Sequence, residues 1–213
     1  MNEQFSLTQF FLLGGFFMWP LLVFSIATLG LILERFAYIA LHDLSVAKLK
    51  GQVLDLIALG NAEGAKSFLR TQNRRRSAAP IFLACLDSAS LGEHRMEKAV
   101  EAVAGERIRK LENGFNFLQA LASLSPLTGF LGTVSGMIGA FRSIANASEV
   151  NAQLVANGIY EALITTVFGL IIAIIAITAY NLFAHIVDKF AGEIEKGASD
   201  LIEATLLQAE TGK

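Results

Sequence analysis

The sequence predicts an all-α integral membrane protein with three transmembrane helices and long cytoplasmic helical extensions. Hydrophobic residues make up 54% of the chain and the mean hydropathy is +0.52. They are concentrated in three runs, 10–33, 115–141 and 151–184, of which only the last contains an acid or base, Glu161. Each run exceeds the roughly 20 residues that a helix needs to cross a bilayer. In lipid the backbone must satisfy its own hydrogen bonds, so an open chain crosses as a helix.

The first span is predicted at residues 10–33, after a periplasmic tail of residues 1–9. This tail carries Glu3 and neither Lys nor Arg, so it lacks the positive region of a secretory signal peptide. The apolar run is also longer than a signal sequence requires. We therefore expect a retained transmembrane helix.

The distribution of positive charge predicts the orientation. Lys and Arg number none in residues 1–9, thirteen in 34–114, one in 142–153 and three in 185–213. Cytoplasmic segments carry the excess of Lys and Arg in membrane proteins. The N-terminus and the loop 142–153 are therefore predicted to be periplasmic. The 34–114 domain and the C-terminal helix 185–213 are predicted to be cytoplasmic.

The elements between and after the spans are predicted to be helices. Residues 44–60 have apolar residues at helical spacing and end at a glycine, and Asn61 is placed to cap the next helix. The charged segment 93–115 is expected to continue directly into the second span at 115–141. The third span is predicted at 154–184, followed by an amphipathic helix.

The second and third spans each have a face of small and polar residues. In the third span this face lies within about 140° on a helical wheel, and small residues on such a face allow neighbouring helices to approach closely. The residues on the two faces include Gly129, Gly132, Thr133 and Gly136 in the second span, and Gly158, Glu161, Thr165, Thr166 and Gly169 in the third.

Polar atoms at membrane depth indicate an ion pathway. A charged carboxylate facing lipid costs a few kcal/mol, so Glu161 is expected to face a water- or protein-lined interior or to be protonated. The alternative is that it reaches headgroup water. Thr133 and Thr166 are expected near mid-bilayer on helices of opposite direction. Each hydroxyl could instead bond a carbonyl of its own helix. Together with Thr165, these side chains are the candidate ion pathway.

Two motifs resemble signatures of a known family. The segments "PLTGFLGTVSGMIGAF" (126–141) and "GIYEALITTVFGLIIAIIAITAYN" (158–181) are similar to those of the ExbB/TolQ branch of the MotA/TolQ/ExbB proton-channel family. Three spans and a large cytoplasmic domain agree with that branch, whereas MotA itself has four spans. One departure is Ile175, which stands where the family often has proline.

The resemblance implies a homopentamer in the bacterial inner membrane, with spans two and three lining a central pore. A dimer of an ExbD- or TolR-like single-span protein would occupy that pore and bring a membrane aspartate that is protonated and released. The family's pore threonine corresponds to Thr133, its glutamate to Glu161 and its second threonine to Thr166, and Thr165 is an additional hydroxyl. The resemblance also implies that ion flow drives rotation between the pentamer and the dimer, and that an effector similar to TonB or TolA receives this rotation.

The resemblance favours a motor that energises TonB-dependent outer-membrane transport, conducting protons and carrying no cofactor. A TolQ-like envelope function, motility, or conduction of sodium remains open. A channel or secondary transporter acting alone and a structural scaffold are the alternatives from other classes. The residues favour no enzyme, metal site or nucleic-acid contact. His42, His94 and His185 lie far apart in sequence, and the lone Cys85 has no disulfide partner within the chain.

Overall fold

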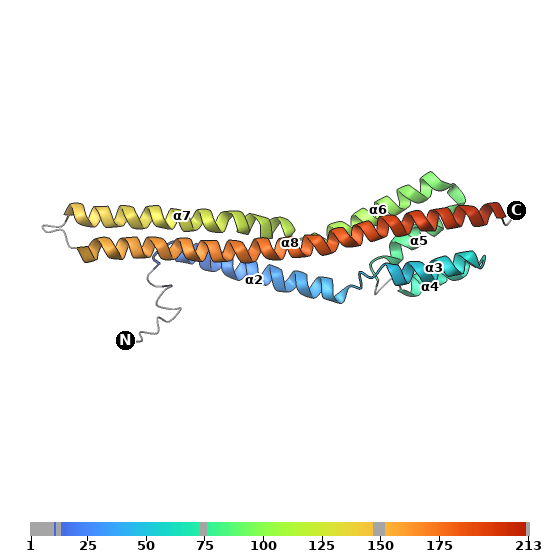
Figure 1. Cartoon of the computed structure of the whole chain (residues 1–213), viewed down its shortest axis with the longest axis horizontal. Helices are drawn as coiled ribbons and strands as arrows, with labels where there is room; N and C mark the ends of the chain where they lie inside the picture. Colours follow the sequence, from blue (N-terminus) through green and yellow to red (C-terminus); the bar gives the residue numbers. More distant parts are fainter. Residues whose placement is uncertain (1–10, 12–13, 73–75, 147–151, 212–213) are drawn as a thin grey trace. The chain divides into compact units, whose positions relative to one another are not determined.

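The computed structural model describes residues 11, 14–72, 76–146 and 152–211, and the regular structure in these segments is helical (Figure 1). Within these segments no strand forms, and Asp43 and Arg76 make an isolated bridge. The predicted all-α class is confirmed. The elements are α2 (Met18–Leu41), α3 (Ala47–Ala58), α4 (Ala62–Gln72), α5 (Ala79–Asp87), the short 3₁₀ helix η1 (Ala89–Leu91), α6 (Glu93–Leu111), α7 (Phe115–Asn146) and α8 (Ala152–Thr211).

Three described helices are long and apolar enough to cross a membrane, as predicted, and they belong to α2, α7 and α8. The predicted periplasmic tail 1–9 lies outside the described residues, as does the centre of the loop predicted at 142–153. The apolar helices leave large side chains exposed, among them Trp19 on α2, Phe130 on α7 and Ile174 on α8. Such surfaces suit contact with lipid or with other transmembrane helices.

Helix α2 occupies Met18–Leu41 rather than the predicted 10–33. The difference has two causes. Gly15 adopts φ +67°, a left-handed conformation that glycine accepts readily, and the chain turns there before the helix begins. At the other end the hydropathy pattern stops at the first charges, Glu34 and Arg35, but the helix continues through them. Hydropathy predicts which residues can lie in the hydrocarbon of the membrane, but it does not predict the residue at which a helix ends.

The expectation that 93–115 runs directly into the second span is wrong. Helix α6 ends at Leu111 and α7 starts at Phe115, with Gly114 between them at φ +86°. A left-handed residue cannot continue a right-handed helix, and glycine accepts this conformation readily. For the third span and the segment after it, two separate helices were predicted, at 154–184 and 185–213, but the structure has one. Helix α8 is continuous from Ala152 to Thr211.

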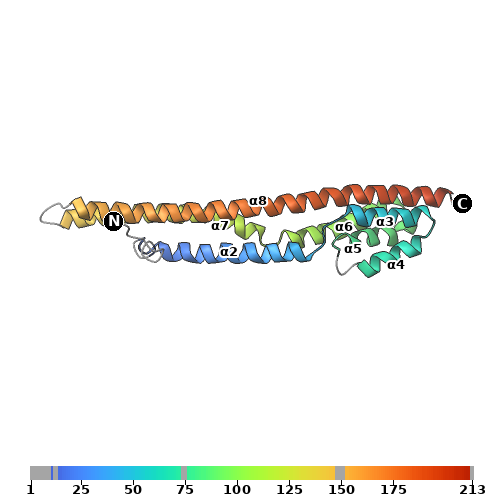
Figure 2. The ribbon, with the colours of Figure 1, turned by 60° about the horizontal axis from the view of Figure 1, so that its bottom comes forward.

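The described chain packs as two compact units. The first contains α7, α8 up to Leu182 and α2 up to Glu34. In it α7 and α8 run side by side (Figure 1), and α2 lies along α8 (Figure 2). Met18 and Leu21 of α2 form a buried cluster with Ile164 and Ile172 of α8.

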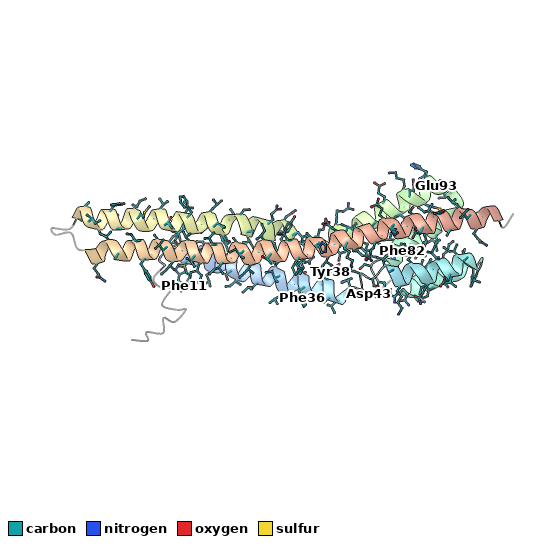
Figure 3. The ribbon with its side chains drawn as sticks, viewed as in Figure 1. Phe11, Phe36, Tyr38, Asp43, Phe82 and Glu93 are labelled. Atoms are coloured by element: carbon teal, nitrogen blue, oxygen red, sulfur yellow. The ribbon has the colours of Figure 1, made fainter. Side chains whose placement is uncertain are left out.

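The second unit combines the end of α2 from Arg35, helices α3 to α6 with η1, and α8 from Phe183 onward. Phe82 of α5 (Figure 3) is fully buried and lies against Gly197 of α8. Lys50 of α3 pairs with Asp200 of α8 at 2.6 Å. The predicted cap is confirmed, because the Asn61 side-chain oxygen accepts a hydrogen bond from the Gly64 backbone N–H at 2.8 Å.

Candidate functional site

The contact between α7 and α8 is built from glycines, which we call the glycine seam. A Cβ atom added to any of them would come within 3.0 Å or less of an atom of the facing helix. Real Cβ atoms essentially never approach other heavy atoms closer than 3.0 Å, which applies to all of these glycines except Gly136, where the distance is 3.0 Å. The seam consists of Gly129, Gly132 and Gly136 of α7 and Gly158 and Gly169 of α8.

At Gly129 and Gly169 an added Cβ would come closer than 3.0 Å to the backbone of the facing helix. A Cβ on Gly169 would lie 2.5 Å from the carbonyl oxygen of Ser125, and a Cβ on Gly129 would lie 2.7 Å from that of Thr165. Side-chain rotation cannot relieve such contacts, because the facing atoms belong to helix backbones. Close approach of this kind is what small residues permit in membrane helix pairs.

Two threonine hydroxyls converge on one carbonyl in the seam. Thr166 Oγ1 donates to the carbonyl oxygen of Gly129 at 3.3 Å. Thr165 Oγ1 lies 3.2 Å from the same oxygen and 2.8 Å from the carbonyl oxygen of Ala162 in its own helix. The Thr165 side chain is 1% exposed and fills the space beside Gly132. Thr165 therefore lies inside the helix contact, whereas Thr166 lies at its edge and is partly exposed.

Thr133 lies next to the seam residue Gly132 and is partly exposed. Its hydroxyl donates to the carbonyl oxygen of Phe130 in the same helix, at 2.7 Å. The oxygen of such a hydroxyl still has lone pairs that can accept a hydrogen bond or contact a cation. No hydrogen bond in the described part of the chain joins Thr133 to the other candidate residues.

Glu161 lies against the turn that precedes α2. Its Oε1 atom occupies the place where a Cβ on Gly15 would stand, and its Cδ would be 2.8 Å from that Cβ. The side chain is only partly exposed. Because Gly15 is left-handed and has no side chain, the backbone of the turn can pass directly over the carboxylate.

The structure therefore divides the polar face predicted for the third span. Glu161 and Thr166 are five residues apart, which is about 140° around a helix. Glu161 points toward the side where Ile164 and Ile172 meet α2, and Thr166 lies at the α7 side. Thr165 stands between them in the seam. Sequence reasoning missed Gly15, although the adjacent pair Gly14–Gly15 inside an apolar run was a usable signal for a turn.

Among the described residues no group of three or more His, Cys, Asp or Glu is placed to hold a metal ion. The polar groups at the seam and at the Gly15 turn are instead single hydroxyls, the Glu161 carboxylate and the carbonyls that face the hydroxyls. Such groups can accept or pass a proton, and they can replace part of a cation's hydration shell.

Comparison with known proteins gives a family match and several relatives. The family model for the MotA/TolQ/ExbB proton channel family matches residues 68–196. The ExbB-like 3 biopolymer transport protein of Synechocystis sp. is 35% identical over 174 residues, covering 80% of this chain and 81% of that protein. The Tol-Pal system protein TolQ of Haemophilus influenzae is 44% identical over 84 residues, 39% of this chain and 37% of that protein. The biopolymer transport protein ExbB of Salmonella typhimurium is 34% identical over 108 residues, 51% of this chain and 43% of that protein.

Proposed function

Because this chain belongs to the ExbB/TolQ branch of the MotA/TolQ/ExbB proton channel family, we propose that it is the multi-span subunit of an ion-driven motor in the bacterial inner membrane. One observation carries the proposal. The family match over 68–196 contains the whole glycine seam and the four candidate pathway residues Thr133, Glu161, Thr165 and Thr166.

The motor requires a second protein in this proposal. The chain's aspartates are Asp43, Asp55, Asp87, Asp188 and Asp200, and none of them lies in the three apolar runs. An ExbD- or TolR-like single-span dimer, held inside a homopentamer of this chain, would supply the membrane aspartate. Release and uptake of its proton would then drive movement of the partner relative to the pore.

The pathway residues have different roles in this scheme. Thr133 and Thr166 are partly exposed at the seam's edges and would offer oxygens to the aspartate or to the ion as it passes. Glu161, near the predicted periplasmic end, would raise the local concentration of cations. Thr165 is 1% exposed and would act by holding α7 against α8.

The effector is a TonB-like protein in the preferred version, so that the motor energises outer-membrane transport. The match to proteins named as biopolymer transport proteins favours this version. The match to a Tol-Pal system protein favours the alternative, a TolQ-like role in envelope maintenance with a TolA-like effector. In both versions the N-terminus is periplasmic and the C-terminus cytoplasmic.

The test is ion flux in liposomes that carry this chain alone or this chain with its single-span partner. A proton gradient and a sodium gradient are applied in separate experiments. We expect flux only with the partner, and with protons in preference to sodium. Equal flux from the chain alone would identify a channel or transporter acting by itself and would refute the motor. Sodium-selective flux with the partner would keep the motor and change the ion.

A further inference from the structure

A small basic pocket lies in the second unit, where the end of α2 meets the end of α6. Its volume is about 340 Å³. Three of its six lining residues are cationic and one is a carboxylate. The lining residues are Arg35, Tyr38, Glu106, Arg109, Lys110 and Asn113.

The pocket residues stand in sequence next to the ends of two apolar runs, since the first run ends at residue 33, two residues before Arg35. Trp19 and Tyr38 stand near the two ends of α2, and Tyr38 is in its last turn (Figure 3). They are separated by 19 residues, or about 28 Å of helix, close to the hydrocarbon thickness of about 30 Å. Trp and Tyr are enriched at the two membrane interfaces. The apolar run of α7 also starts at Phe115, two residues after the pocket residue Asn113.

Contacts within the pocket hold its cations in place. Arg35 is 4% exposed, and its Nη1 donates to the carbonyl oxygen of Lys110 at 3.2 Å. The Arg35 guanidinium carbon lies 4.9 Å from the centre of the Tyr38 ring. The hydrogen bond ties α2 to α6, the ring contact lies within α2, and together they hold a buried positive charge beside the cavity.

The Glu106 carboxylate offsets only one of the three positive charges that line the pocket. Glu106 accepts a hydrogen bond from Lys110 Nζ at 2.5 Å, and this bond and the charge of Lys110 lower the Glu106 pKa. Glu106 therefore stays ionised and counts as one negative charge. Among the six lining residues, Arg35, Arg109 and Lys110 carry three positive charges against the one negative charge of Glu106.

We propose that this pocket binds the phosphate of an anionic lipid headgroup, in the membrane leaflet on the side of the 34–114 domain. The planar guanidinium of Arg109, which is exposed, matches the geometry of a phosphate, and Lys110 adds a second charge from the same turn. Basic pockets on the cytoplasmic side of transmembrane helices bind anionic headgroups for the same reasons. Phe36, next to Arg35 on α2, is 64% exposed and offers an apolar surface to an acyl chain.

The test uses the full chain purified in a neutral detergent and titrated with phosphatidylglycerol or phosphatidylcholine, with bound lipid counted by native mass spectrometry. The pocket variant is Arg109→Gln with Lys110→Gln, which leaves the buried Arg35 in place. The matched control is Arg95→Gln with Lys98→Gln. It removes one Arg and one Lys that are exposed on the same helix and do not line the pocket. Lys98, like Lys110, is paired with a glutamate of α6.

We expect phosphatidylglycerol to bind more tightly than phosphatidylcholine. Loss of two interfacial cations should weaken phosphatidylglycerol binding about 30-fold in the pocket variant. The control should bind as the parent chain does. Equal binding by the two double variants, or equal binding of the two lipids, would overturn the proposal. A third arm adds inorganic phosphate at the lipid concentration, and displacement of the lipid would show a site for a soluble anion instead. Thermal melting of each variant establishes that it is folded.

Discussion

Gly169→Ala tests the glycine seam at the position where the facing atoms can yield least. The added Cβ would lie 2.5 Å from the Ser125 carbonyl oxygen and 3.3 Å from the Gly129 Cα. Ordinary contact begins at 3.4 Å, so α7 and α8 would have to separate by about 0.9 Å at this point. Overpacking of this kind typically costs about 1–3 kcal/mol.

The size of the effect follows from a comparison with a control glycine. Gly139 lies on α7 and Gly30 on α2, and a Cβ on either would meet nothing within 4 Å. Gly→Ala in a helix gains about 1 kcal/mol from backbone propensity alone, and this gain is common to all three positions. The difference between Gly169→Ala and either control should therefore be the overpacking cost, about 1–3 kcal/mol.

Reversible unfolding in mixed detergent micelles measures the free energy of unfolding for each variant. We expect the two controls to equal or exceed the parent chain in stability and Gly169→Ala to be the least stable. The separation should also lengthen the Thr166–Gly129 hydrogen bond beyond its present 3.3 Å. Equal stability of all three variants would show that α7 and α8 are not in close contact at Gly169, and the seam would have to be abandoned.

Three further predictions concern single positions. Gly15→Ala should destabilise the chain by about 1–3 kcal/mol in the same unfolding assay, because φ is +67° and the Cβ would meet Glu161; an unchanged stability would contradict the turn over the carboxylate. Asn61→Ala should lower the stability of the second unit by about 1 kcal/mol, and retained stability would mean that the cap contributes nothing. Burial raises the pKa of the Cys85 thiol from 9.0 to about 12, so maleimide should label it only after unfolding, and rapid labelling of the folded chain would contradict its burial. Since the unfolded chain would lose that proton first, Cys85 should reduce stability as pH rises from 9 toward 12.

The sequence predicted the features that depend on local composition. Apolar runs identified three spans, and the spacing of Asn61 identified a cap that the structure contains. It failed where backbone conformation decides the outcome. Gly114 separates α6 from α7, although the helical pattern of the charged residues before it and the apolar residues after it favours one continuous helix. Glycines 192 and 197 remain helical in α8, so glycine alone does not predict a break.

The candidate site shows the same division. A helical wheel places Glu161, Thr165 and Thr166 on one face. It does not show which neighbouring helix or turn packs against each part of that face. In the structure Thr165 is covered by α7, and Glu161 is covered by the turn at Gly15. Both contacts join segments far apart in sequence, where residue spacing carries no signal. The pathway roles of Thr133, Glu161 and Thr166 remain predictions.

The most direct test of the motor is proton flux through liposomes that contain this chain and its single-span partner, with Thr166→Ala compared with Thr178→Ala. Thr178 lies on the same helix and is exposed, and it belongs to neither the seam nor the candidate pathway. The account predicts that Thr166→Ala abolishes most partner-dependent flux while Thr178→Ala leaves it near the parent value. Equal flux through the two variants would contradict a pathway at the edge of the glycine seam.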